Sequence, residues 1–341
     1  MNPADILSRT RKRAGLFEMG TRGLLEVRGE DRIRWLDGMV SGDIAALEKG
    51  DSGSGCYAML LTNRGAIVAD LHIGRIGDVL VLECLRSEIP RVQETLEKFI
   101  IADDVELVDR SAEQAVLGIA GPDAPSILEA AITGDTPMPS SEDWGKFEIA
   151  GCEILVGAFG FSGELGFQLR FDEADRAVIE DALDAAGGDG GIVRGDAGVL
   201  EILRVEAGIP ALGQELDEEV LPPEARLERA ISTSKGCYVG QEIVARLRAR
   251  GQVNHLLVGL RLDVEGLPEV GIALSAEGRT TGELTSIVDS PSLGPIALGY
   301  VRREHADPGT RLVFEGGQAA VVELPLVTVQ GSAASAGSGT P

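Results

Sequence analysis

Two segments of the chain share one order of apolar and polar positions. Residues 25–40 and 117–132, 92 positions apart, each run from a strand-like apolar segment through a glycine and an aspartate into apolar residues at helical spacing. The glycine allows a tight turn, and the aspartate two positions later suits the positive end of a helix. Chance similarity of two short segments is the alternative. We predict a duplicated α+β unit of strand, turn and helix.

Hairpins and a closing helix are predicted after each unit. Alternating patterns indicate strands over 57–61, 66–73 and 79–84 in the first half, and over 147–156 and 165–171 in the second. Helices are predicted over 90–101, with proline near its first turn, and over 173–185, with Asp172 as N-cap. The glycine-rich stretch 187–198 is typical of a surface loop or a domain boundary.

The pattern changes at Asn254 to short β-like runs broken by glycine and proline. They cover 256–262, 285–288, 297–301, 311–314 and 320–324. This spacing indicates a small antiparallel barrel or sandwich. We therefore divide the chain into an α+β region over 1–250, a β domain over 251–329 and a disordered tail over 330–341, rich in Gly, Ser and Ala.

Composition restricts the function. A length of 341 residues excludes a single small module, and 44% apolar residues with a mean hydropathy of +0.08 can bury sizeable cores. Lys and Arg total 31 against 55 Asp and Glu, which gives a net charge of −24. Because this charge repels phosphate backbones and anionic lipids, we expect neither a nucleic acid nor a membrane partner. A small anion in a local basic pocket is still compatible with it.

No targeting or metal-binding pattern is visible. The basic residues near the start precede no apolar stretch, and no run approaches the ~18 residues of a membrane span. The four cysteines lie tens of residues apart without a nearby histidine pair, so no metal site of local ligands is expected. We predict a cytoplasmic monomer with reduced thiols.

The most specific motif is Lys-Gly-Cys-Tyr-Val-Gly-Gln-Glu, residues 235–242. Two glycines flank Cys237 and Tyr238, and a helical stretch with three arginines begins near Gly240. A thiol near a helix N-terminus and two residues from Lys235 has reasons for a lowered pKa, since positive charge favours the thiolate. The alternative for Cys237 is a small packed hydrophobe.

This motif closely resembles the signature of the YgfZ-type folate-binding proteins, which assist iron–sulfur enzymes and are related to the T-protein, or aminomethyltransferase, of glycine cleavage. The resemblance extends to residues 121–124, 161–167, 203–210 and 213–221, and so covers nearly the whole chain before the tail. It implies an α+β fold in a three-lobed ring. Two α+β lobes intertwined in sequence and a C-terminal antiparallel β-barrel would surround a folate in the central hole.

The resemblance also implies site residues. The T-protein carboxylate beside the reacting folate nitrogen lies in a stretch that aligns with residues 65–70, so that Asp70 takes its place, while Ala69 replaces the acid before it. Tyr57, thirteen positions earlier, matches a folate-contacting tyrosine. Gly74 stands where the family has a second tyrosine. His72 lies two residues from Asp70 on a predicted strand, so the two side chains could hydrogen-bond.

Glu206 is the residue that the family uses for the pterin edge. That edge presents two parallel N–H donors, which a carboxylate accepts in the bidentate manner it uses with guanidinium. The arginines at 246, 248 and 250 could meet the glutamyl tail of folate, or form a solvated basic stripe. The candidate residues are Asp70 and Cys237 for chemistry, and, for folate, Tyr57, Asp70, Glu206, Lys235, Tyr238 and Arg246.

Two functions follow. The first is a tetrahydrofolate-binding protein that supports iron–sulfur cluster assembly or repair, with assembly factors or client proteins as partners. The alternative is an aminomethyltransferase or another folate-dependent one-carbon transferase, with Asp70 orienting the folate nitrogen or moving a proton. Asp70 favours the transferase, whereas Ala69, the missing second tyrosine and the Cys237 motif favour the binding protein.

Overall fold

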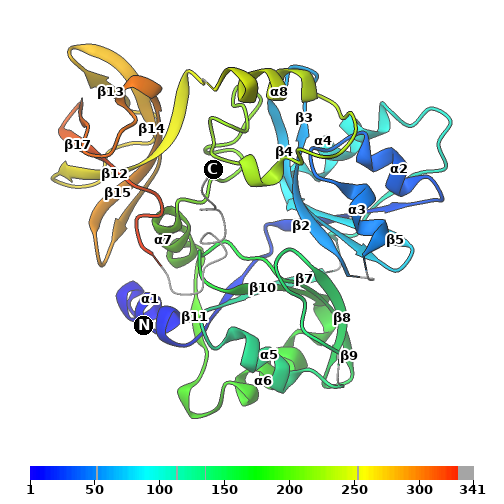
Figure 1. Cartoon of the computed structure of the whole chain (residues 1–341). Helices are drawn as coiled ribbons and strands as arrows, with labels where there is room; N and C mark the ends of the chain where they lie inside the picture. The colour runs from blue at the N-terminus through cyan, green and yellow to red at the C-terminus, as the bar shows by residue number, and fades with distance from the viewer. Residues whose placement is uncertain (51–52, 113, 135, 252, 329–341) are drawn as a thin grey trace.

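A computed structural model describes residues 1–50, 53–112, 114–134, 136–251 and 253–328. It consists of three lobes arranged around a central region (Figure 1). Two lobes combine a sheet with helices and the third is a closed barrel, which confirms the predicted α+β fold with its C-terminal barrel. The tail predicted over 330–341 lies outside the described residues.

The first lobe is a five-stranded antiparallel sheet with helices on one side (Figure 1). Its strand order is β3 (Gly55–Leu61), β4 (Ile67–Ile76), β5 (Val79–Leu85), β2 (Arg22–Arg28) and β6 (Glu106–Asp109). The helices are α2 (Arg32–Asp37), α3 (Ile44–Lys49) and α4 (Ile89–Glu97). Their apolar faces pack with the inner face of the sheet into one core.

The second lobe takes its strands from two distant parts of the chain. Its order is β11 (Val193–Gly195), β1 (Gly15–Glu18), β7 (Gln114–Ala120), β10 (Gly166–Asp172), β9 (Cys152–Gly157) and β8 (Trp144–Ile149), with helices α5 (Ala124–Ala131) and α6 (Arg176–Ala186). Helix α1 (Pro3–Lys12) precedes β1. Because β1 comes before the whole first lobe in sequence, the two lobes are intertwined.

The duplicated unit is confirmed. Strand β2 leads through Gly29 into α2, and strand β7 leads through Gly121 into α5. Both glycines have positive φ, 101° and 126°, where a side chain would be strained. The first helix is shorter than predicted, because it ends at Asp37 and Val40 instead forms a bridge with Leu60.

Several predicted boundaries are wrong for local reasons. The stretch 187–198 is no domain boundary, since Val193–Gly195 forms β11 in parallel with β1 and α7 (Ala197–Ala207) follows at once. The helix expected from residue 173 begins at Arg176, after a 3-10 turn that the Asp172 carboxylate caps. The single strand expected over 147–156 is two strands, because Ala150 and Gly151 turn the chain with positive φ.

The third lobe settles the choice between barrel and sandwich in favour of a closed barrel. Its order is β12 (His255–Val264), β15 (Gly294–Arg302), β14 (Arg279–Ser290), β13 (Ala273–Ala276), β16 (Arg311–Phe314) and β17 (Gly317–Val322). Helix α8 (Gln241–Arg250) precedes it. Val205 of α7 packs on barrel residues Leu257 and Val288, so that α7 joins the barrel to the second lobe.

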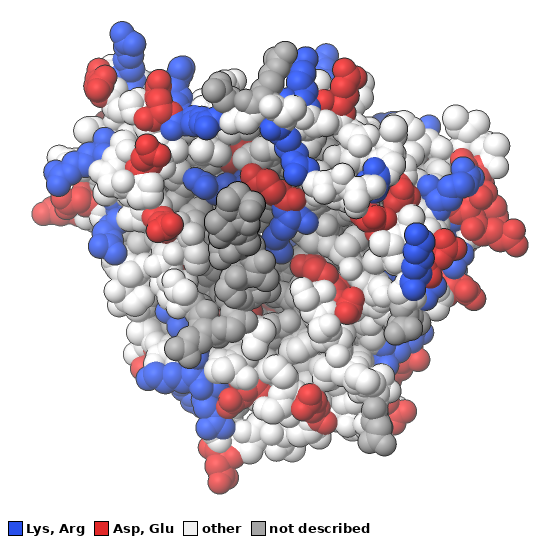
Figure 2. All heavy atoms as spheres, viewed as in Figure 1, with Lys and Arg blue, Asp and Glu red and all other residues white. Residues whose placement is uncertain are grey.

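The surface carries charges of both signs. Figure 2 shows acidic and basic side chains intermixed on one face of the molecule. The described part of the chain contains no helix with the length and apolar character that a membrane span requires.

Candidate functional site

A buried tyrosine–aspartate pair lies on the first lobe. Tyr57 of β3 and Asp70 of β4 are on adjacent antiparallel strands, and the Tyr57 hydroxyl donates to Asp70 Oδ2 at 3.2 Å. Asp70 is only 5% exposed, and its Oδ1 has no hydrogen-bond partner among the described residues. Burial and the charge of Asp70 raise the pKa of Tyr57 well above its ordinary value, so its phenol stays a donor.

His72 belongs to the same cluster but does not bond Asp70. It lies opposite Tyr57 in the β3–β4 register, its ring stacks on Phe159 at 3.9 Å between centroids, and it meets the Tyr57 ring at 4.8 Å. Its Nδ1 lies 2.7 Å from Oε2 of Glu142. The expected Asp70–His72 hydrogen bond is therefore wrong, because the second lobe brings in a carboxylate that the strand pattern did not show.

A second buried charge cluster joins the first two lobes behind this site. Arg22 donates to both oxygens of Glu83, at 2.5 and 2.8 Å, and the Arg22 guanidinium lies over the Phe161 ring at 4.6 Å. Gln168 and Arg170 of the second lobe add donors to Glu83 Oε1 at 3.1 and 3.4 Å. Burial opposes the charge on Glu83, but Arg22 and Arg170 outweigh it and lower its pKa to about 2.

Glu206 is buried where α7 meets the barrel and α1. Its side chain is 1% exposed; Ser290 donates to Oε1 at 2.5 Å and Arg11 donates to Oε2. The carboxylate predicted for the pterin edge thus already has a protein donor on each oxygen. Ser292 also donates to Oε1, at 3.4 Å, so three of the four lone pairs of the carboxylate are used and one further donor can still be accepted, at Oε2.

Glu164 is a site residue for which the sequence analysis had assigned no role. It lies 3.6 Å from Arg11 Nε, its side chain is 2% exposed, and its Oε1 has no hydrogen-bond partner among the described residues. Burial raises the pKa of Glu164 to about 7; Arg11 opposes the shift and the charge of Glu206 adds to it. Its position inside the motif at 161–167 was the available clue.

Residues 159–164 connect these groups. Phe159 and Phe161 pack on His72, and Glu164 lies at the other end beside Arg11. Gly163 has φ 74°, and a Cβ there would lie 2.6 Å from Cβ of Ala207, so a glycine is needed where this segment passes α7. The segment therefore runs from His72, which lies opposite Tyr57, to Glu164, which shares Arg11 with Glu206.

The motif at 235–242 is held by its lysine. Lys235 Nζ donates to the carbonyl oxygens of Asp37 (2.5 Å), Val40 (2.9 Å) and Gly42 (2.5 Å) and pairs with the Asp37 carboxylate at 3.2 Å. The ammonium predicted to contact folate and to favour the Cys237 thiolate is thus engaged within the protein. The N–H donors of Lys235, which were expected to contact folate, are directed instead at acceptors of the first lobe.

The other residues of this motif differ in exposure. Tyr238 is buried in the same apolar cluster as Tyr57, whereas Cys237 is exposed. Burial raises the pKa of the half-buried Cys56 thiol to about 12, which disfavours its thiolate. Arg246 and Arg248 are exposed on α8, and the side chain of residue 250 is not described.

The position of the second family tyrosine is filled differently here. The indole of Trp144 packs directly against Gly74, where a Cβ would overlap the ring. Trp144 in turn meets Phe159 at 5.1 Å between centroids. An aromatic ring from the second lobe therefore occupies the space beside β4.

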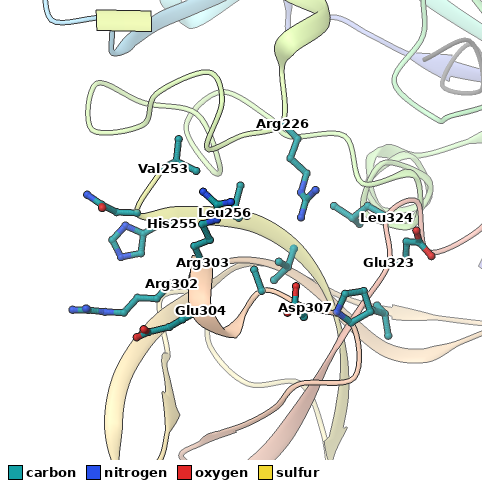
Figure 3. Close-up of a pocket in the computed structure, with 15 residues that line it drawn as sticks. Arg226, Val253, His255, Leu256, Arg302, Arg303, Glu304, Asp307, Glu323 and Leu324 are labelled. Atoms are coloured by element: carbon teal, nitrogen blue, oxygen red, sulfur yellow. The ribbon is translucent and has the colours of Figure 1, made fainter. Parts of the chain in front are cut away.

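A large open groove of about 1250 Å³ lies elsewhere, against the barrel (Figure 3). Arg226, His255, Arg303, Asp307 and Leu324 are among its lining residues, and Arg226 points into it. None of the six predicted folate residues lines this groove. Its charges are of both signs, so they define no single ligand class.

Two intertwined α+β lobes, the first with a buried Tyr–Asp pair, and a closed barrel define the class of T-protein-like folds. Residues 5–235 match the GCVT N-terminal domain, and residues 256–327 match the glycine cleavage T-protein C-terminal barrel domain. The chain belongs to the glycine cleavage T-protein family, as the sequence resemblance implied. The narrower assignment to the YgfZ-type branch stays a prediction.

The chain is similar to several aminomethyltransferases over most of its own length and most of theirs. The chain is 31% identical to an aminomethyltransferase of Saccharopolyspora erythraea over 321 residues, 92% of this chain and 86% of that protein. It is 32% identical to an aminomethyltransferase of Streptomyces avermitilis, covering 88% and 81%. Its fold resembles the glycine cleavage system aminomethyltransferase T from Bartonella henselae, with a TM-score of 0.84 at 23% identity, covering 96% and 90%.

Proposed function

We propose that the protein is a folate-dependent one-carbon transferase of the aminomethyltransferase kind. The observation that carries this proposal is the buried Asp70, whose Oδ2 is held by Tyr57 while Oδ1 has no partner among the described residues. An unpaired buried carboxylate oxygen is costly unless a ligand or a proton satisfies it. The similarity to aminomethyltransferases supports the same conclusion. We therefore prefer the transferase, the alternative in the sequence analysis, to the iron–sulfur role that the sequence analysis gave first.

The residues fit a ligand that brings N–H donors. Two carboxylate oxygens, Asp70 Oδ1 and Glu164 Oε1, are buried without donors in the described parts of the chain. Tetrahydrofolate, when bound, supplies the nitrogen that accepts the one-carbon unit. Asp70 would orient a ligand N–H or take its proton at Oδ1, and Tyr57 would fix the carboxylate through Oδ2. Glu206 and Glu164 would hold the polar edge of the same ligand.

The test is a transfer assay with aminomethylated lipoyl carrier protein and tetrahydrofolate as substrates. We expect the wild-type protein to form methylenetetrahydrofolate and Asp70→Asn to lose about 10²–10⁴-fold in rate, the usual effect of removing a positioned acid or base. Asp189→Asn, an exposed aspartate on a turn of the second lobe, is the matched control. Absence of product with the wild type would refute the transferase, whereas an unchanged rate with Asp70→Asn would refute the role given to Asp70.

A second candidate is the YgfZ-type role in iron–sulfur assembly or repair, with folate bound at the same site. The observation that favours it is the contrast within the motif at 235–242. Lys235 and Tyr238 are anchored in the protein, whereas Cys237 between them is exposed. A thiol presented on a fixed loop could meet a client protein or an assembly factor. For both candidates we propose a cytoplasmic monomer.

The second candidate is tested at Cys237. We predict that peptide mapping shows Cys237 reacting with iodoacetamide faster than the half-buried Cys56 and the buried Cys84, because lower accessibility and raised pKa values slow those two thiols. Cys237→Ala should keep folding and tetrahydrofolate affinity but lose support of iron–sulfur enzymes in a deletion strain. Cys152→Ala is the control. Full complementation by Cys237→Ala would contradict the second candidate and leave the transferase as the one proposed function.

A further inference from the structure

A carboxylate of the second lobe reaches the ring of Tyr57 through two intermediaries. Glu142 Oε2 lies 2.7 Å from His72 Nδ1, and Glu142 Oε1 lies 3.5 Å from Arg229 Nη1. Both partners pack on Tyr57. The His72 ring is 4.8 Å from the Tyr57 ring, and the Arg229 guanidinium lies over it at 4.5 Å.

The backbone at Glu142 is itself specialised. Its φ is 68°, the left-handed region that a side chain rarely adopts. Its N–H donates to the Ala158 carbonyl at 3.0 Å, and its own carbonyl packs so closely on Gly55 that a Cβ there would overlap it. A residue held in a costly conformation by its surroundings, at a site between two lobes, indicates that its placement matters.

Charge supports the same arrangement. Burial opposes ionisation of Glu142, but His72 and Arg229 outweigh it and lower its pKa, so the residue remains a carboxylate. Tyr57 has its hydroxyl on Asp70, the residue given the central role above. Glu142 therefore stands at the head of a chain of contacts that ends at Asp70.

We propose that Glu142, His72 and Arg229 form a tether that positions Tyr57 on Asp70, with Glu142 as the anchoring residue. Its consequence for the reaction rests on the proposed function, because only a ligand at Asp70 would sense the orientation of the carboxylate. The tether also makes the first lobe depend on the second, since Glu142 belongs to the segment entering β8 while Tyr57 and His72 belong to β3 and β4.

The chain offers a direct probe, because it contains only three tyrosines, Tyr57, Tyr238 and Tyr300. The protein is labelled with 3-fluorotyrosine, and Tyr57→Phe assigns the Tyr57 resonance in the ¹⁹F spectrum. We expect Glu142→Gln to move that resonance in the ligand-free protein and to weaken tetrahydrofolate binding about tenfold. The Tyr300 resonance serves as an internal reference, since the Tyr300 hydroxyl donates to the Glu215 carbonyl, away from Glu142.

Two further variants complete the test. Arg229→Gln changes a side chain that is 57% exposed and so should fold, and it should move the Tyr57 resonance in the same way. Glu148→Gln removes an equal charge from the exposed face of β8 and should move nothing. A Tyr57 resonance that stays in place in both Glu142→Gln and Arg229→Gln would overturn the tether. Failure of the wild-type protein to bind tetrahydrofolate would instead count against the proposed function, because the resonance test needs no ligand.

Discussion

A cluster of buried charged residues joins the first two lobes. Glu83 and Arg170 are fully buried at the junction, and Arg22 joins them from β2. Desolvating such ions is expensive, and their attraction offsets the cost only when every partner is present. Removing one partner therefore leaves an uncompensated charge in the interior.

We predict that Glu83→Gln lowers the free energy of unfolding by about 3–5 kcal/mol, as measured by urea denaturation at pH 7. The control is Glu18→Gln, an exposed partner of Arg176, which should cost less than about 1 kcal/mol. An equal effect of the two substitutions would contradict this assignment.

The pH dependence of the same variant gives a second readout. The folded-state pKa of Glu83 is about 2, below its ordinary value of 4.5, so its stabilisation is present above pH 4.5 and is lost as the pH falls toward 2. The difference in unfolding free energy between wild type and Glu83→Gln should therefore shrink over that window. A constant difference would mean that the charge of Glu83 is not what stabilises the junction.

Sequence patterns located the residues whose partners are close in the chain or carried by a motif. Tyr57 and Asp70 were singled out by the family resemblance, and both belong to one hairpin, where the structure joins them by a hydrogen bond that was not predicted. Glu142 and Arg11 were not predicted, because their partners His72 and Glu206 lie 70 and 195 positions away. No local pattern encodes such a contact; only the fold of the two lobes brings these residues together.

At the scale of elements, the turns after β2 and β7 could be predicted from the sequence, because a turn with positive φ favours a glycine. The strand β11 was missed within a glycine-rich stretch, since what makes it a strand is its pairing with β1, 178 positions earlier by the register Gly15 to Val193. β-structure depends on neighbours more than on its own composition. The barrel strands were largely found because their turns recur regularly.

The loop before α8 shows how an element can be fixed from outside. Lys235 fills a ring of backbone carbonyls at the end of α2 and before α3, so the loop is tied to the first lobe rather than to its own helix. The sequence had placed Lys235 beside the thiol as an electrostatic aid. Its acceptors belong to residues almost 200 positions earlier, which explains why the sequence did not show them.

At the scale of the whole molecule, α1, the barrel and the segment that follows β17 converge on α7. Arg11 of α1 and Ser290 of the barrel both bond the Glu206 side chain, and the Val327 N–H donates to the Glu206 carbonyl at 3.1 Å. Helix α1 and the barrel thus both contribute to the surroundings of Glu206, although the net charge is −24. A ligand there would contact buried carboxylates rather than the charged outer surface.

Binding of tetrahydrofolate between the lobes is tested most directly by calorimetric titration of the intact protein. We predict one saturable site in the wild-type chain, and at least about tenfold weaker affinity for both Asp70→Asn and Glu206→Gln, because each loses a charged acceptor for ligand N–H groups. Asp189→Asn, with its side chain on the surface, should bind like wild type. Absence of saturable binding by the wild-type protein, or unchanged affinity in both substituted proteins, would contradict a folate site at Asp70 and Glu206.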